Sequence, residues 1–175
     1  MGLRLALLAG CLLAGAVIDG AWLSRLPLGA GPDLLLLVVL AVGLRRGFES
    51  GAVIGVVAGY VRDLLSGSPL GVFALSYLAV GAMAGAASPM VDLQQRAMPA
   101  ASALVATLAL ALISATTVTV TGVVVVSWSL LAADSAIAAA MNAVLAGPVD
   151  ALVRWIDRVT QRRYSGRVIG HKVLR

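Results

Sequence analysis

Six long apolar stretches follow one another along the chain, separated by short segments that contain proline, glycine or charged residues. A helix of about 20 apolar residues crosses the hydrocarbon core of a bilayer. The pattern therefore predicts an all-α polytopic membrane protein, a six-helix transmembrane bundle that forms one domain over residues 1–160. The predicted spans are residues 3–23, 32–46, 48–65, 72–88, 98–121 and 130–147.

Three of the stretches depart from a simple crossing. Residues 32–46 are short for a full span, so we expect this helix to be tucked among others or to lie in a thin part of the bilayer. The fifth apolar run continues to residue 126, and we expect it to loosen near Gly122 or to project from the membrane. Pro148 should kink the chain, and residues 149–164 should form an amphipathic extension at the membrane surface.

The composition excludes a soluble globular domain. Hydrophobic residues make up 61% of the 175 residues and charged residues 12%, and the mean hydropathy is +1.01. Soluble domains carry about 25% charged residues. So few charges cannot cover the surface of a globular protein in water.

The residue types also argue against an enzyme. Cys11 and His171 are the only cysteine and histidine, so an internal disulfide, a His/Cys metal site and a cysteine–histidine nucleophile pair are all excluded. An aspartyl dyad of the intramembrane-protease kind would need aspartates in a catalytic motif, and those near the predicted outer side have none. We therefore expect a non-enzymatic protein without a metal or other cofactor.

The distribution of basic residues predicts the orientation in the membrane. Six crossings put both termini on one side, which then holds eleven of the 13 basic residues. The other side holds only Arg25 and Arg62. The positive-inside rule therefore places both termini in the cytoplasm. Residues 165–175 form a basic cytoplasmic tail, which we expect to fix orientation and contact anionic lipid rather than nucleic acid.

Glycine recurs at every fourth position of the third predicted span. The row consists of Gly47, Gly51, Gly55 and Gly59. Each glycine costs an isolated helix about 1 kcal/mol relative to alanine, so the row indicates a compensating contact. Small residues on one face let another backbone approach closely in lipid. We expect a helix-packing groove for the first or fourth helix, or a partner groove for a helix of another protein.

Five polar residues near the predicted outer ends of the helices form a second candidate site. Ionisable groups at membrane depth are costly and are usually paired. Arg62 is expected to pair with Asp19 or with Asp134. The group would pin helix ends, or would form the floor of an outward-facing cavity or a partner contact. We call it the outer polar cluster, and it comprises Asp19, Tyr60, Arg62, Asp63 and Asp134.

A resemblance to a known family is carried by two segments, PDLLLLVVLAVGLRRG and GAVIGVVAGYVRDLLSGSPLGVFALSYLAVGAMAG. They resemble the bacterial rod shape-determining protein MreD family, in which a Pro-Asp-Leu helix precedes a glycine-rich helix, a short turn and a small-residue helix. The resemblance covers residues 31–88, and the long threonine-rich fifth run departs from the family. The matching residues are Pro32, Asp33, Gly47, Gly55, Gly59, Tyr60, Asp63, Leu70 and Gly71.

The resemblance implies a multi-pass protein of the bacterial cytoplasmic (inner) membrane that belongs to the cell-elongation machinery. MreD-like proteins bind MreC, a single-pass membrane protein. They are linked indirectly to MreB and to the elongation glycosyltransferase and transpeptidase that build peptidoglycan. The family has no established catalytic residues, and its fold is thought to be similar to the S-components of energy-coupling-factor transporters.

Two functions of different kinds therefore remain open. The first is a scaffold that holds MreC and helps to maintain rod shape during peptidoglycan synthesis. The second is a small-molecule-binding transporter subunit of the S-component type, with a polar cavity lined by residues such as Asp19, Tyr60, Asp63 and Asp134. The second function would require a partner ATPase, because the chain lacks a phosphate-binding Gly-Lys-Ser/Thr loop.

Overall fold

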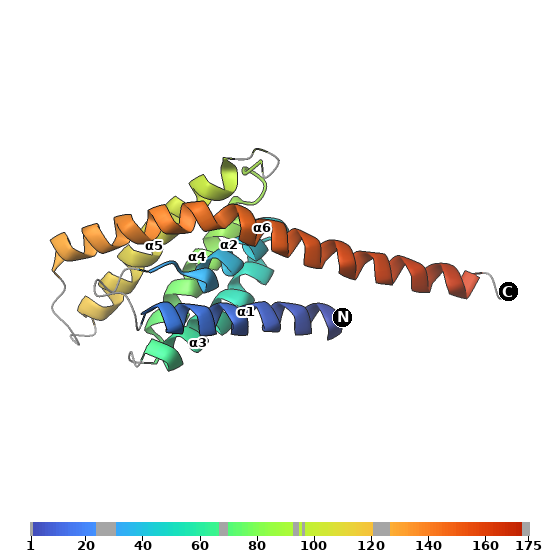
Figure 1. The fold of residues 1–175 in the computed structure, drawn as a ribbon, viewed down its shortest axis with the longest axis horizontal. Helices are drawn as coiled ribbons and strands as arrows, with labels where there is room; N and C mark the ends of the chain where they lie inside the picture. Colours follow the sequence, from blue (N-terminus) through green and yellow to red (C-terminus); the bar gives the residue numbers. More distant parts are fainter. Residues whose placement is uncertain are drawn as a thin grey trace.

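A computed structural model describes residues 2–23, 31–66, 70–92, 95, 97–120 and 127–172. These residues form six helices and no strand, which pack into one bundle (Figure 1). In chain order the helices are α1 (Gly2–Leu23), α2 (Leu34–Arg46), α3 (Phe48–Ser66), α4 (Val72–Ala87), α5 (Met98–Val120) and α6 (Trp128–Lys172).

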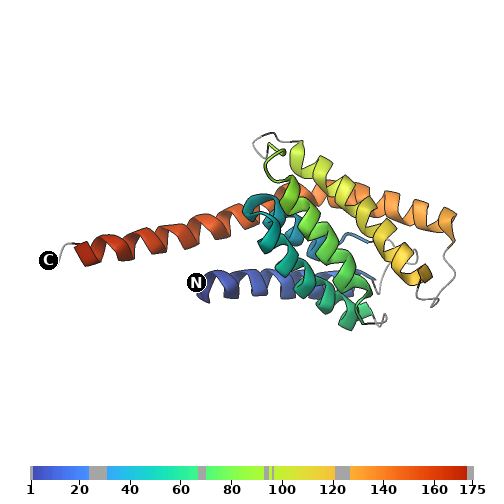
Figure 2. The same cartoon turned by 180° about the vertical axis from the view of Figure 1, so that it is seen from behind.

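The last helix differs most from the sequence-based expectation. α6 runs unbroken for 45 residues with Pro148 inside it, where the sequence predicted a span over residues 130–147, a kink at Pro148 and an amphipathic extension over residues 149–164. Both views show α6 bending partway along, and its C-terminal part extends beyond the other helices (Figures 1 and 2). Proline removes one hydrogen bond from a helix and so permits a bend without ending it. The expected loosening near Gly122 lies outside the described residues.

The short α2 is the centre of the bundle. All ten residues from Leu35 to Leu44 are buried, and each of the other five helices contacts α2. A helix of 13 residues is about 20 Å long, too short for a hydrocarbon core of about 30 Å. The shortness is tolerated because α2 is covered by protein. Its uniformly apolar sequence is that of a helix buried on all sides.

Charged pairs join the C-terminal end of α2 to α6. Arg45 donates from Nε and Nη2 to one oxygen of Asp150, at 2.8 Å and 2.6 Å. Arg46 makes a close ion pair with Asp157. Arg154 lies 3.5 Å from the other Asp150 oxygen. With Val153 and Ile156 buried, these pairs fix the first part of the predicted 149–164 extension against the bundle.

Among the described residues, two helices are long and apolar enough to cross a membrane by length and composition, namely α5 and the Trp128–Thr160 part of α6. Ala9–Gly20 and Val72–Ala87 are shorter apolar helices. The first residues of α1 and the last turns of α6 lie at the same end of the molecule in both views (Figures 1 and 2). This placement is the one that an even number of crossings requires.

Candidate functional site

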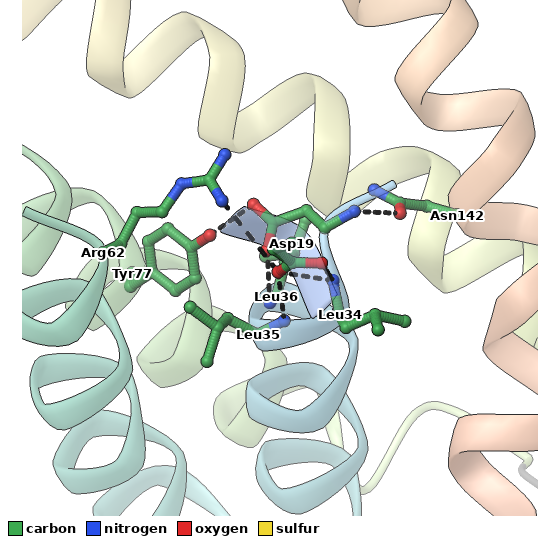
Figure 3. Close-up of polar contacts among 8 residues, drawn as sticks. Asp19, Leu34, Leu35, Leu36, Arg62, Tyr77 and Asn142 are labelled. Atoms are coloured by element: carbon green, nitrogen blue, oxygen red, sulfur yellow. Dashed lines mark hydrogen bonds and ion pairs between the residues drawn. The ribbon is translucent and has the colours of Figure 1, made fainter. Parts of the chain in front are cut away.

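A network of polar residues surrounds the N-terminal end of α2, where the first backbone N–H groups of a helix lack partners within the helix. Asp33 is the N-cap of α2, and its Oδ1 accepts from the Leu36 amide at 2.9 Å. Tyr77 of α4 donates its hydroxyl to the other Asp33 oxygen. The Asp33 amide donates to Oδ1 of Asn142 at 2.8 Å. Figure 3 shows Asp19, Tyr77 and Asn142 converging here from three different helices.

Asp19 provides a second cap for the same helix, from α1. Its carboxylate accepts from the Leu34 amide at 3.1 Å and from the Leu35 amide at 3.3 Å. The side chain is 1% exposed. The partial positive charge at a helix N-terminus stabilises a buried carboxylate in this position. Asp19 therefore ties α1 to the start of α2.

Arg62 is the one basic residue described at this end of the bundle. Its guanidinium reaches from α3 toward the N-terminal end of α2 (Figure 3), where Nη1 lies 3.9 Å from Asp19. The guanidinium carbon lies 5.8 Å from the centroid of the Phe73 ring. Arg62 Nε is buried and has no hydrogen-bond partner among the described residues. Of the two partners the sequence left open, Asp19 is the one in ion-pair range.

Asn142 extends the network into α5 and α6. Its Nδ2 donates to the Thr107 hydroxyl at 3.0 Å, while its oxygen accepts from Asp33. Asn142 is fully buried. One side chain thus joins α6, α5 and the start of α2, as interhelical hydrogen bonds do in membrane bundles.

Asp63 lies apart from this network and caps a different helix. Its two oxygens accept from the backbone amides of Gly71 at 2.9 Å, Phe73 at 2.9 Å and Ala74 at 3.2 Å. Gly71 is the N-cap of α4, with a φ of 104° that favours glycine. The sequence grouped Asp63 with Asp19, whereas in the structure Asp63 caps the start of α4 and Asp19 caps the start of α2.

The remaining members of the outer polar cluster are placed differently again. Tyr60 is 50% exposed on the surface of α3. Asp134 of α6 is half-buried and lines a cavity of about 180 Å³ together with Asp33, Arg62 and Asn142. Asp19, Arg62 and Asp134 therefore lie at one end of the bundle, whereas the Tyr60 side chain is on the surface of α3 and is not part of this group.

Several residues of the network were not among the predicted site residues. Asp33 stands between a proline and an apolar helix, which is an N-cap signal, so the sequence could have revealed it. Tyr77 and Thr107 offered no such signal, because each stands on an apolar helix that carries other hydroxyl side chains, such as Ser76 on α4 and Ser114 on α5.

The glycine row faces α4 of the same chain. A Cβ at Gly51, Gly55 or Gly59 would come closer than 3.0 Å to the backbone carbonyl of Gly81, Tyr77 or Phe73 respectively. Gly81 of α4 meets the Gly51 backbone in return. Because α4 fills this face, a partner helix cannot occupy it at the same time.

Gly47 is a glycine for a different reason. A Cβ there would meet nothing within 4 Å. Gly47 is instead the C-cap of α2, with a φ of 85°, a conformation that side chains other than glycine rarely adopt. Gly85 of α4 leaves room for the Gly47 backbone, because a Cβ on Gly85 would lie 2.5 Å from the Gly47 carbonyl.

An apolar groove of about 310 Å³ lies on the other side of α4. Its floor is Leu40 and Leu44 of α2, and α4 and α5 form its walls. The walls are rich in small residues, with Ala84, Ala87, Ala101, Ser102, Ala106 and Ala109. We call it the α4–α5 groove.

Five of the described carboxylates act as helix caps or ion-pair partners, namely Asp19, Asp33, Asp63, Asp150 and Asp157. Within the part of the chain that the structure describes, no group of three or more His, Cys, Asp or Glu side chains could hold a metal ion. The arrangement is that of an all-helical bundle whose polar residues join helices to one another, and two of its described helices are apolar enough to cross a membrane.

Comparison with known families identifies the chain further. The family model of the rod shape-determining protein MreD matches residues 6–156, more than four fifths of the chain. The chain therefore belongs to the MreD family. Searches of curated proteins and of solved structures gave no significant match. Membership of this family implies a role in rod shape determination.

Proposed function

We propose that this chain is a non-enzymatic inner-membrane scaffold of the bacterial cell-elongation machinery, which binds MreC and helps to maintain rod shape during peptidoglycan synthesis. The observation that carries the proposal is the family match over residues 6–156. The use of Asp19, Asp33 and Asp63 as caps supports it, because these acids stabilise a rigid bundle. MreB and the elongation glycosyltransferase and transpeptidase are then indirect partners.

We place the transmembrane helix of MreC in the α4–α5 groove. The glycine row is occupied by α4, whereas this groove is a concave apolar surface at the side of the bundle. Small side chains on both walls let a further helix come close, and close approach is the main source of helix association in lipid. A single-pass partner has one such helix to offer.

Co-purification of MreC with a tagged copy of this chain from membranes tests the proposal. Wild-type protein should retain MreC, and Ala87→Trp and Ala101→Trp should each reduce the retained amount severalfold by filling the groove. Ala136→Trp, at an exposed position of α6 outside the groove, is the matched control and should retain MreC fully. Failure of the wild type to retain MreC contradicts the scaffold, and unaltered retention by both groove variants contradicts only the location.

A small-molecule-binding subunit similar to an energy-coupling-factor S-component is the second candidate. The cavity of about 180 Å³ beside Arg62 and Asp134 favours it. Such a subunit works with an ATPase, so an ATP-binding partner should co-purify with the chain. A complex that contains MreC and no ATPase favours the scaffold instead.

A further inference from the structure

The cavity beside Arg62 has a mixed lining that distinguishes it from the apolar α4–α5 groove. It lies between the N-terminal end of α2 and parts of α3, α4, α5 and α6. We call it the polar cavity, and its polar lining comprises Asp33, Arg62, Thr107, Ser114, Asp134, Ser135 and Asn142. We propose that the polar cavity binds a phosphate ester that carries an ammonium group, with the phosphate against Arg62 and the ammonium against Asp134. The proposal holds whether the chain acts as a scaffold or as a transporter subunit.

The unpaired hydrogen-bond donors of Arg62 indicate that an anion binds in the polar cavity. A guanidinium has five N–H donors and no acceptor, yet the side chain is only 15% exposed and its Nε has no hydrogen-bond partner in the described residues. The nearest Asp19 oxygen is 3.9 Å from Nη1, beyond hydrogen-bond distance. An oxyanion in the cavity would supply the acceptors that the guanidinium lacks, and phosphate suits its planar fork.

The neighbouring carboxylates of Asp19 and Asp33 do not serve as the hydrogen-bond acceptors of Arg62. Asp19 already accepts from the Leu34 and Leu35 amides. Both Asp33 oxygens are also engaged, by the Leu36 amide and by the Tyr77 hydroxyl. Each carboxylate oxygen could accept a further hydrogen bond, yet among the described residues neither Asp19 nor Asp33 accepts one from Arg62. The donors of the guanidinium are therefore available to another group.

Asp134 and the depth of the cavity indicate the rest of the ligand. Asp134 is a half-buried carboxylate on the same cavity, and it attracts a cationic hydrogen-bond donor such as an ammonium. It lies six residues after Trp128, about 9 Å along α6. Trp128 is 58% exposed, and exposed tryptophans mark the headgroup level of a membrane. The abundant oxyanion at the headgroup level, about 9 Å along α6 from Asp134, is a lipid phosphate.

The size of the cavity fits the same ligand. A volume of about 180 Å³ equals roughly six water molecules at their share in the liquid. This space holds an ethanolamine phosphate group, while acyl chains would remain outside along α5 and α6. The same group could arrive on a lipid or as a free solute, so the experiment must separate the two sources.

Native mass spectrometry of the full-length protein tests the proposal. Protein from phosphatidylcholine nanodiscs is titrated with phosphatidylethanolamine, with phosphatidylglycerol and, in a separate series, with soluble O-phosphoethanolamine. Phosphatidylethanolamine should be retained over phosphatidylglycerol, and both over phosphatidylcholine, which has no N–H or O–H donor. Binding of O-phosphoethanolamine without preferential retention of phosphatidylethanolamine would identify a free solute as the source.

Variants locate the site within the protein. Arg62→Gln and Asp134→Asn should each weaken binding about tenfold, the loss expected for one charged hydrogen-bonding partner, and Arg62→Lys should recover part of it. Arg154→Gln and Glu49→Gln remove charges outside the cavity and should leave binding unchanged. Equal retention of all three lipids with no binding of O-phosphoethanolamine, or unaltered binding by Arg62→Gln and Asp134→Asn with circular dichroism spectra like that of the wild type, overturns the proposal. Loss of this binding with MreC still retained would leave the scaffold intact.

Discussion

At the scale of single residues, the acidic side chains inside the bundle act mainly on backbone amides. Asp19 and Asp33 serve the start of α2, and Asp63 serves the start of α4. A helix N-terminus buried in a membrane protein cannot obtain these hydrogen bonds from water, so a carboxylate supplied by another segment stabilises it. Two of the three caps, those from Asp19 and Asp63, belong to a different helix from the one they cap, and they therefore also hold neighbouring helices together.

Asp63→Ala should lower the free energy of unfolding by about 1–2 kcal/mol, because three amides at the start of α4 lose their acceptor. Thermal unfolding in detergent, followed by circular dichroism, measures the loss. Glu49→Gln, an exposed acid on the same helix, is the control and should change stability little. Equal stability of Asp63→Ala and the wild type would show that the capping bonds contribute nothing.

The role of a single residue could be predicted from the sequence only where its neighbours in the chain indicated that role. Asp33 follows a proline and precedes four leucines, which indicates an N-cap. Sequence spacing could not choose a partner for Arg62, because Asp19 and Asp134 are distant in sequence and both were placed at the same end. Tyr77 meets Asp33 only through the packing of α4 on α2, a tertiary contact that no local rule contains.

At the scale of helices, the glycines of α3 and α4 determine how closely these two helices pack. Gly51 and Gly81 lie against each other's backbone, and Gly43 of α2 lies at the same point. Glycine at every fourth residue of α3 predicted a close contact with another helix. The sequence did not decide whether that helix was α1, α4 or a helix of a partner protein. The observed neighbour is α4, the next helix in the chain.

Gly55→Ala should lower the free energy of unfolding by about 1–3 kcal/mol, because the added methyl group would overlap the Tyr77 carbonyl and the backbone of α4 cannot move away freely. Gly10→Ala is the matched control, since Gly10 is exposed on α1 and a Cβ there meets nothing within 4 Å. The control should be neutral or up to about 1 kcal/mol more stable. Denaturant titrations of the two variants compare them, and equal effects would contradict the close packing of α3 on α4.

Helix boundaries show where sequence patterns are informative. The bounds of α1 to α5 lie within two residues of the predicted spans, since proline, glycine and charged residues separate the apolar stretches. α6 departs because the predicted span ended at residue 147, whereas the helix continues past Pro148 to Lys172. The bundle holds both sides of Pro148 in one helix, through Asn142 before it and Asp150 after it.

At the scale of the whole molecule, two polar groupings at opposite ends of α2 hold the bundle together. Asp19, Asp33 and Asn142 act at its N-terminal end, and Arg45 pairs with Asp150 near its C-terminal end. The apolar centre between them gives little directional preference in lipid. These polar contacts therefore specify which helices lie beside α2.

Arg45→Gln should lower the free energy of unfolding by about 3 kcal/mol, because it leaves the buried Asp150 carboxylate without its main partner. Arg154→Gln removes a second, 40% exposed partner of the same carboxylate and should cost no more than about 0.5 kcal/mol. Chemical denaturation in detergent gives both values. A smaller loss for Arg45→Gln than for Arg154→Gln would contradict the assigned pairing.

The orientation of the molecule is a separate prediction. A reporter fused after the last residue should read as cytoplasmic, because the predicted inner side carries most of the basic residues. A fusion in the predicted external loop between α3 and α4 should read as external. An external C-terminal reporter would reverse the proposed topology.

Cell shape tests the central claim most directly. In the bacterium that encodes this chain, depletion of the protein should turn rods into rounded cells, and re-expression of the wild type or of Gly10→Ala should restore the ratio of cell length to width. Cells that keep their rod shape and their pattern of peptidoglycan insertion after the protein has been removed would contradict the proposed function.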